Sequence, residues 1–280
     1  MQSTRIALIQ IRWLGKVEQM KERYRVLVKE AAEKGASLVC LPEFSLIPYF
    51  PGTTDAKGFE WAESLPESDS QKFFCELAKD NKVYVVGSLY EKADAKLYFD
   101  TATIASPAGE MIAVTRKIHI PYGEGYNETH FFRGGESYPV HVLPPLQIAT
   151  PTCYDQWFPE LSRIYALNGA ELIYYPTAIG SEPTDPNIDT AESWQTVMRG
   201  QAIASGVFIA AANRVGEENG VRFYGSSFIC DPTGKVLAQA SRDKEEVIVA
   251  DLDAYTFDHW RELFPLLKQR RPETYEALAR

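Results

Sequence analysis

The chain repeats one pattern in EKGASLVCLPE, residues 33–43, and LNGAELIYYPT, residues 167–177. Each stretch has Gly-Ala, then Leu beside a β-branched residue, and then Pro at the same offset. A Gly after a helical stripe suits the left-handed end of a helix, and the apolar run after it is typical of a buried strand. The pair is therefore a helix–strand unit that any α/β protein can contain, or it marks two similar halves of one fold.

Two similar halves would pack sheet against sheet, with the turns after both strands at one edge. In α/β folds, ligands gather at the carboxyl ends of the strands. Glu43 and Thr177, which close the two stretches, would then hold equivalent positions on that edge. This interpretation directs the search for functional residues to positions that follow predicted strands.

The rest of the chain alternates between helix and strand patterns without a low-complexity linker. Apolar positions that step by three and four predict a helix over 17–32, and further helices are expected near 71–79, 158–167 and 191–205. Strands are expected at 5–11, 37–41, 82–90, 97–106, 110–115, 146–152, 171–175, 207–212, 223–230, 235–239 and 246–252. We expect a single domain over residues 1–280, in which 254–280 is a C-terminal tail.

The composition is that of a globular protein, with 45% hydrophobic and 24% charged residues. The net charge of −9 predicts no nucleic-acid partner and suits a neutral or cationic small ligand. No apolar run approaches the roughly 18 residues of a membrane helix, and the start, MQSTRIALIQ, predicts a strand rather than a signal peptide. We therefore expect a cytoplasmic protein without membrane association. The four Cys and four His lack disulfide-scaffold or metal-ligand spacing, so no metal site is expected.

Three candidate catalytic residues each follow a predicted strand: Glu43 in LPEF, Lys117 in TRKIHIP and Cys153 in TPTCYDQWFPE. Cys153 stands between a strand and a helix, where a helix dipole and a nearby cation lower the pKa of a thiol. A nucleophilic thiol needs a base or a cation beside it, and Glu43 and Lys117 are candidates for these roles. Each residue alone also fits an ordinary structural role. The other cysteines lie in apolar patterns and are interpreted as packing residues: Cys40, Cys75 and Cys230.

Together these motifs make the chain resemble the nitrilase or carbon–nitrogen hydrolase superfamily, from RIALIQ to RRPETY. Within it, the N-carbamoylputrescine amidases are most similar, through DQWFPE, YPTAIGSEP and FYGSSFICDPTG at residues 155–160, 175–183 and 223–234. The resemblance implies a four-layer α-β-β-α sandwich of the nitrilase type. It also implies a cofactor-free hydrolase of ureido or amide carbon–nitrogen bonds, and a homodimer or higher homo-oligomer with residues 254–280 in the interface.

The same resemblance implies the chemical roles. Cys153 would be the nucleophile, Glu43 the general base, and Lys117 and the Tyr154 N–H the donors to the oxyanion. Glu128, in GYNE, would support Lys117 and position the substrate. N-carbamoylputrescine would then yield putrescine, ammonia and carbon dioxide, a step of putrescine and polyamine biosynthesis, through a covalent thiol intermediate.

The ammonium of N-carbamoylputrescine needs an acidic partner, because an unpaired buried cation is costly. The loop after the strand at 171–175 supplies Glu182, Asp185 and Asp189, and Glu182 is the first candidate. By resemblance, His119 would support the catalytic residues from outside the substrate cavity rather than carry a proton. The candidate oxyanion and substrate-binding residues are Tyr154, His119, Trp157, Thr177, Glu182 and Asp185.

The chain departs from the subgroup's pattern in several places. Thr152 and Tyr154 flank Cys153, where the subgroup usually has an aliphatic residue and Trp. Residues 98–100 read Tyr-Phe-Asp instead of the usual Tyr-Asn-Ser. The subgroup's usual His before a Trp is Ser193 in this chain. These departures leave the exact substrate open.

Other functions remain alternatives. D-amino-acid carbamoylases are similar too, but they carry two adjacent arginines where this chain has Gln156 and Trp157, which argues against a carboxylate-bearing substrate. An aliphatic amidase or a nitrilase of other specificity would share the catalytic residues. A catalytically silent binding protein on the same fold would lack one of them. A Rossmann-type oxidoreductase would need a Gly-rich turn after the first strand, which the sequence lacks.

Overall fold

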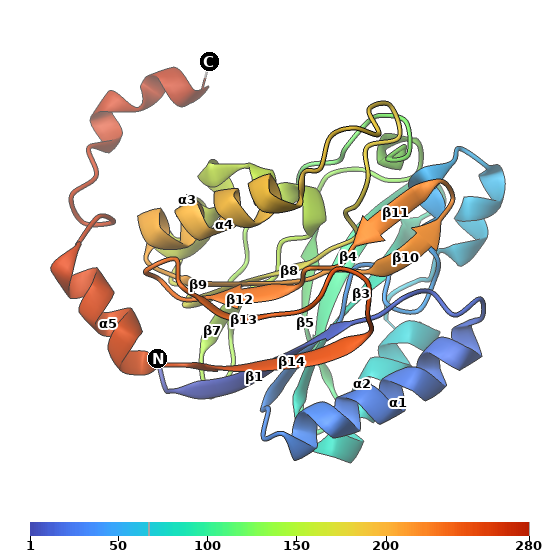
Figure 1. Cartoon of the computed structure of the whole chain (residues 1–280), viewed down its shortest axis with the longest axis horizontal. Helices are drawn as coiled ribbons and strands as arrows, with labels where there is room; N and C mark the ends of the chain where they lie inside the picture. Colours follow the sequence, from blue (N-terminus) through green and yellow to red (C-terminus); the bar gives the residue numbers. More distant parts are fainter. Residues whose placement is uncertain (67, 280) are drawn as a thin grey trace.

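Four layers make up the computed structural model, which describes residues 1–66 and 68–279 (Figure 1). In this part of the chain, two six-stranded sheets lie face to face, and a two-stranded ribbon stands beside them. Helices α1 and α2 cover one sheet and α3 and α4 cover the other (Figure 1). The predicted α-β-β-α sandwich is confirmed.

The first sheet has the order β14-β1-β2-β3-β4-β5, and β1 pairs in parallel with β2 and antiparallel with β14. The helix α1 turns a stripe of apolar residues spaced by three and four onto this sheet, from Met20 to Ala31. The elements of this half are β1 Thr4–Gln10, α1 Val17–Glu33, β2 Leu38–Cys40, η1 Phe50–Gly52, η2 Ala56–Trp61, α2 Asp69–Asn81, β3 Tyr84–Asp94, β4 Leu97–Ala105, β5 Met111–Arg116 and β14 Glu246–Leu252.

The second sheet has the order β13-β12-β9-β8-β7-β6, and Trp194 of α4 is fully buried against it. The elements of this half are η3 Glu128–His130, β6 His141–Val142, β7 Gln147–Ala149, η4 Cys153–Trp157, α3 Pro159–Leu167, β8 Leu172–Pro176, α4 Ala191–Ser205, β9 Phe208–Ala212, β12 Phe228–Cys230 and β13 Val236–Gln239. The ribbon consists of β10 Val215–Glu218 and β11 Val221–Tyr224.

The two stretches with a shared sequence pattern hold equivalent places in the two sheets. The strand β2 lies between the parallel neighbours β1 and β3, and β8 lies between the parallel neighbours β7 and β9. The hydroxyl of Tyr174 donates a hydrogen bond to the Leu41 carbonyl at 2.5 Å, across the core between the sheets. The interpretation as two similar halves is therefore confirmed.

The predicted strands at 146–152 and 223–230 both include residues that lie outside any strand. The strand expected at 146–152 ends at Ala149, and the next residues lead into η4. The strand expected at 223–230 is split into β11 and β12. Gly225 and Ser226 lie between these two strands with φ of 55° and 59°, and a left-handed backbone cannot continue a strand.

The predicted C-terminal tail has two parts. The helix α5 (Ala254–Leu263) packs on its own chain, where Phe257 is buried and stacks on Phe208 with ring centroids 6.2 Å apart. Beyond α5, the chain leads away from the body of the molecule, through η5 (Pro272–Thr274) and η6 (Glu276–Ala279) (Figure 1). In residues 1–66 and 68–279, no helix combines the length and the apolar character that crossing a membrane requires.

Candidate active site

Cys153 begins η4 at the point where the chain leaves β7 and turns toward α3. Its φ of 42° lies in the left-handed region, which costs a residue with a side chain about 1–3 kcal/mol. The first N–H groups of a helix have no partner within the helix. The N–H groups of Cys153 and Tyr154 stand in that first turn, so they can serve as donors beside the thiol.

Lys117 follows β5 directly, and its side chain is fully buried. Its Nζ donates to Glu43 Oε1 at 2.9 Å and to Glu128 Oε2 at 2.5 Å. Asp100 Oδ2 lies 3.5 Å from the same Nζ. All three carboxylates are themselves fully buried, so the ammonium lies within a desolvated acidic cluster that comes from the turn after β2, from η3 and from β4.

Burial and mutual charge govern the protonation of this cluster. Burial acts to lower the pKa of Lys117, but the charges of Glu128 and Glu43 outweigh it and raise that pKa well above its usual value. Burial raises the pKa of Glu128 to about 7, against the attraction of Lys117. Lys117 therefore keeps its positive charge through the neutral range.

The thiol of Cys153 behaves differently from the prediction made from its place in the sequence. Burial, followed by the charge of Glu43, raises its pKa well above the usual range, and the attraction of Lys117 is too weak to reverse this. This direction is opposite to the lowered pKa expected from a helix N-terminus and one cation, because burial beside acids outweighs both of them. At neutral pH the Cys153 side chain is therefore a thiol, and a thiol needs a base beside it to act as a nucleophile.

A cavity of about 510 Å³ opens over Cys153. Its volume is in the range of small-molecule sites, and Glu128 reaches its floor. Among the described residues, no Lys or Arg lines it. The walls include Tyr122, Tyr126, Tyr154, Trp157, Glu124 and Glu182.

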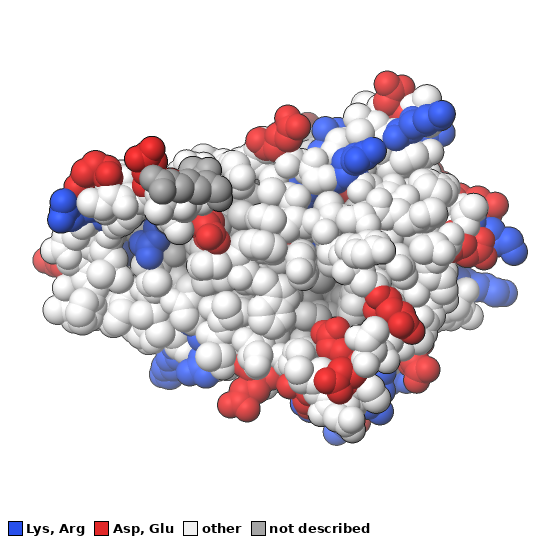
Figure 2. All heavy atoms as spheres, turned by 90° about the horizontal axis from the view of Figure 1, so that it is seen from above, with Lys and Arg blue, Asp and Glu red and all other residues white. Residues whose placement is uncertain are grey.

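The loops that carry these walls lie at the top of Figure 1, on the side that Figure 2 shows from above. Acidic side chains gather beside a hollow near the centre of this face, and the basic side chains lie toward its margins (Figure 2). The charged side chains that line the cavity itself are likewise acidic: Glu124, Glu128 and Glu182.

The predicted residues that line this cavity are Glu128, Cys153, Tyr154, Trp157 and Glu182. Glu43, Lys117 and Glu128 form the cluster whose charges act on the thiol of Cys153. His119 lies outside this cluster and outside the cavity lining, as expected. Its Nδ1–H donates to Asp155 Oδ1 at 2.9 Å, and its ring stacks on Phe158 with centroids 3.6 Å apart.

Thr177, Asp185 and Asp189 do not reach the cavity, which corrects the expectation for these three residues. Thr177 is fully buried, and its hydroxyl donates to the carbonyl of Tyr175 at 3.0 Å. Asp185 is exposed and accepts a hydrogen bond from the loop's own backbone at 3.3 Å. Asp189 pairs with Arg242 at 2.9 Å. The conformation of the loop, which the sequence does not show, separates these acids from Glu182.

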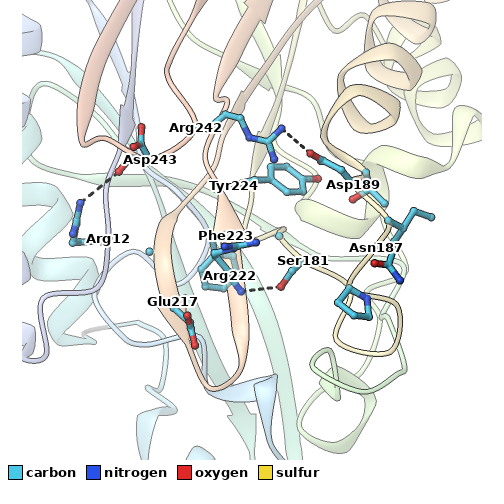
Figure 3. Close-up of a pocket in the computed structure, with 15 residues that line it drawn as sticks. Arg12, Ser181, Asn187, Asp189, Glu217, Arg222, Phe223, Tyr224, Arg242 and Asp243 are labelled. Carbon is cyan, nitrogen blue, oxygen red and sulfur yellow. Dashed lines mark hydrogen bonds and ion pairs between the residues drawn. The ribbon is translucent and has the colours of Figure 1, made fainter.

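A larger cavity of about 610 Å³ lies on the other side of the segment at 180–190 (Figure 3). Arg242 reaches across it to Asp189, while Arg12 lies at the opposite side (Figure 3). Basic and acidic side chains balance in its wall, and neither Cys153 nor the carboxylate cluster takes part. The candidate catalytic residues therefore lie at the smaller cavity.

The family follows from comparison with known proteins. The sequence model of the carbon–nitrogen hydrolase family matches residues 5–262. The chain belongs to the carbon–nitrogen hydrolase family. It is thus a member of the nitrilase superfamily, as the resemblance of its motifs indicated, and it belongs among hydrolases of amide carbon–nitrogen bonds.

Curated relatives and solved structures agree with this family. The chain is 33% identical to citrullinase of Francisella tularensis subsp. tularensis, over 100% of this chain and 99% of that protein. It is 35% identical to N-carbamoylputrescine amidase of Arabidopsis thaliana, over 90% of this chain and 87% of that protein. A carbon–nitrogen hydrolase from Helicobacter pylori G27 superposes with a TM-score of 0.95 at 32% identity, covering 100% and 99% of the two chains. An amidase from Nesterenkonia sp. AN1 in complex with acrylamide superposes with a TM-score of 0.80 at 25% identity, covering 98% and 97%.

Asp155 is a site residue to which sequence analysis gave no role. It is fully buried, and its carboxylate accepts hydrogen bonds from the backbone N–H groups of Thr152 at 3.2 Å, Ile118 at 3.2 Å and His119 at 2.8 Å. One side chain thus ties the turn that carries Cys153 to the residues that follow Lys117. The signal in the sequence was the Asp two positions after Cys at a helix start, a position typical of capping.

Arg214 is a second residue that sequence analysis missed. It is 2% exposed, and its guanidinium donates to Glu218 Oε1 at 3.0 Å and Oε2 at 3.1 Å. Nη1 also donates to the carbonyls of Glu43 at 3.1 Å, Phe44 at 3.2 Å and Ile47 at 3.1 Å. Arg214 therefore fixes the backbone that presents Glu43. A lone Arg after a strand carries no sequence signal for such a role.

Proposed function

We propose that this chain hydrolyses a cationic ureido compound, with N-carbamoylputrescine as the best-fitting substrate, by covalent catalysis at Cys153. The observation that supports this most directly is the position of the buried Lys117 cluster beside Cys153, beneath a cavity whose charged lining residues are acidic. The likeness to N-carbamoylputrescine amidases and to a citrullinase adds support, because both names denote enzymes of ureido compounds.

The geometry suggests the order of proton transfers. Cys153 is protonated at rest, so Glu43 takes the thiol proton as Sγ attacks the ureido carbonyl. Lys117 Nζ and the Tyr154 N–H stabilise the oxyanion of the tetrahedral intermediate. Glu43 then gives the proton to the departing ammonia, which leaves a carbamoyl group on Cys153. Water activated by Glu43 releases that group as a carbamate, which decomposes to the amine and carbon dioxide.

Glu128 supports this reaction rather than acting as its base. Each of its oxygens is engaged: Oε1 accepts from the Tyr49 hydroxyl at 2.9 Å and Oε2 accepts from Lys117. Glu43 accepts from Lys117 at Oε1, and a carboxylate offers about four lone-pair sites. Of the two carboxylates, Glu43 acts more strongly by its charge on the Cys153 thiol, so Glu43 is the proposed acceptor of the thiol proton.

Glu182 is the proposed partner of the substrate's ammonium. It lines the same cavity as Cys153, its side chain is partly buried, and this burial raises its pKa. The Tyr126 hydroxyl donates to the Ser181 carbonyl at 3.1 Å and accepts from Gly180 N–H at 3.1 Å, which holds the segment in place. A partly desolvated carboxylate at a fixed position is suited to a substrate cation.

Glu182→Gln should lower kcat/KM for N-carbamoylputrescine about tenfold to a hundredfold, because a charge-assisted contact contributes roughly 1.5–3 kcal/mol. For N-carbamoylbutylamine, which lacks the ammonium, the same variant should behave like the wild type. Ammonia release is the measurement. Asp185→Asn removes a charge from the same loop outside the cavity and is the matched control.

Equal wild-type kcat/KM values for these two compounds would rule out a cationic substrate. Citrulline is the third substrate to test, because it carries both an ammonium and a carboxylate beyond the ureido group. The cavity offers no Lys or Arg to that carboxylate among the described residues, so a lower kcat/KM for citrulline is expected. Preference for a simple aliphatic amide or a nitrile would instead support the other family specificities.

We also propose that the chain is one carbon–nitrogen hydrolase domain that assembles into a homodimer or higher homo-oligomer through its tail. Leu266, Tyr275 and Leu278 are exposed on the segment beyond α5, which leads away from the body (Figure 1). Exposed apolar groups on an extended segment suit contact with a second copy.

Truncation after Phe264 should therefore give a smaller species by light scattering. This position is preferable to a cut after Asp253, because α5 packs on its own domain and its loss would expose Phe208. The thermal midpoint of the truncated protein is the control for intact folding. An unchanged mass would exclude the tail from the interface.

A further inference from the structure

A buried acid that the proposed reaction does not use lies behind Lys117. Asp100, in β4, is fully buried, and its Oδ2 lies 3.5 Å from Lys117 Nζ. It is not part of the cavity wall, so it can act on the reaction only through its neighbours. In the sequence it appears only as a departure from a Tyr-Asn-Ser pattern.

The charge of this cluster is unbalanced when every acid is ionised. The charged groups facing Asp100 are Glu43 from the turn after β2, Lys117 from the end of β5 and Glu128 from η3. The strand β3 presents the neutral hydroxyl of Ser88. Three carboxylates around one ammonium leave two uncompensated negative charges in a fully buried place, which is strongly unfavourable. Burial, and then repulsion from Glu43, raise the pKa of Asp100 well above its usual value.

The hydrogen bonds show where a proton is needed. Ser88 Oγ donates to Asp100 Oδ1 at 3.3 Å, and Lys117 donates to Glu43 Oε1 at 2.9 Å. Within the described part of the chain, neither Asp100 Oδ2 nor Glu43 Oε2 accepts a hydrogen bond, although both are buried. One carboxylate oxygen of Asp100 nevertheless lies within 4.8 Å of one of Glu43, and the neighbourhood of Glu43 contributes to the raised pKa of Asp100. One proton on Asp100 would satisfy both oxygens, as buried polar groups require.

We propose that Asp100 is a neutral carboxylic acid that donates its proton to Glu43 Oε2 and thereby positions both Glu43 and Lys117 for the reaction. Neutral Asp100 leaves Lys117 free to stabilise the oxyanion, since an ionised carboxylate 3.5 Å away would compete for the ammonium. The inference depends on the Cys153 reaction proposed above, but not on the identity of the substrate.

The first test is the pH dependence of kcat in Asp100→Asn. An amide N–H replaces the acid O–H as donor but cannot lose a proton in this range. At neutral pH we expect kcat within about threefold of the wild type. Wild-type kcat should fall on the alkaline side as Asp100 loses its proton, and the variant should keep its activity to higher pH. Asp80→Asn, at the exposed end of α2, is the charge-matched control and should keep the wild-type profile.

Asp100→Leu tests the need for a donor. It has a similar size but no hydrogen bond to give, so kcat should fall about tenfold to a hundredfold with little change in KM. Recovery of kcat in the Asn variant but not in the Leu variant separates a donor role from a packing role. Thermal midpoints of both variants show whether folding is retained.

Infrared spectroscopy in heavy water gives a measurement that needs no substrate. The difference spectrum between wild type and Asp100→Asn at neutral pH should contain the carbonyl band of a protonated carboxylic acid. Loss of a carboxylate band instead would overturn the inference. A folded Asp100→Asn variant whose kcat falls more than about a hundredfold would also overturn it. So would an Asp100→Asn variant whose kcat decreases at high pH in the same way as that of the wild type. If wild type released ammonia from no ureido or amide compound, the proposed function would fail, and the infrared band would still decide the state of Asp100.

Discussion

Cys153→Ala should abolish ammonia release, by a factor on the order of 10⁴ or more, while the protein stays folded. Removing a covalent nucleophile eliminates the reaction path itself rather than one stabilising contact. Alanine retains the Cβ and removes only the sulfur, whose one hydrogen bond within residues 1–66 and 68–279 goes to the Ala178 carbonyl at 3.8 Å. The fold should therefore be unaffected, with a thermal midpoint close to that of the wild type.

Cys75→Ala is the matched control for the nucleophile, because Cys75 lies half-buried in α2, away from the cavity. It should retain nearly full turnover. Near-native activity of Cys153→Ala would refute the assignment, and so would complete loss of activity in Cys40→Ala with Cys153 intact. A Cys153→Ala protein that binds substrate without turnover would place the defect in the chemical step.

The second large effect concerns stability. Arg214→Met should lower the free energy of unfolding by about 3–5 kcal/mol, because it leaves the carboxylate of Glu218 buried without its cation. The carbonyls of Glu43 and Phe44 lose their donor as well. Urea unfolding measures this change. Turnover should also fall under conditions where the variant remains folded, since the backbone that presents Glu43 is released.

A double variant isolates the cause of this destabilisation. Removing Glu218 together with Arg214 eliminates the unpaired charge, so part of the lost stability should return. Recovery should be incomplete, because Glu218 Oε2 also accepts the Tyr49 N–H at 2.7 Å. A single Arg214→Met variant as stable as the wild type would show that the buried pair contributes little.

The sequence predicted the fold because its signals are local and repeated. Helical spacing in α1 and the shared pattern around β2 and β8 each depend on neighbouring residues, and both halves supply the same information. The catalytic candidates were also accessible, because Glu43, Lys117 and Cys153 follow strands within recognisable motifs. These predictions needed no knowledge of distant contacts.

What could not be predicted depends on contacts between distant segments. Arg214 acts on backbone about 170 positions away, and Asp155 acts on residues 36 and 37 positions away. The pKa of Cys153 is set by complete burial, which arises only when the sheets and loops are assembled. The loop acids differ only in direction: Glu182 faces the cavity and Asp185 faces solvent, a difference that the chain's local pattern does not encode.

The division of the site between the two halves has a consequence for biosynthesis. Glu43, Asp100 and Lys117 all leave the ribosome before Cys153, and they belong with the first sheet or its turns. The thiol follows on the second sheet, and its pKa rises only when the halves have docked and excluded water. A nascent chain thus contains the proposed base and cation before the proposed nucleophile is synthesised. We therefore expect enzymatic activity to appear only after the two sheets have closed on each other.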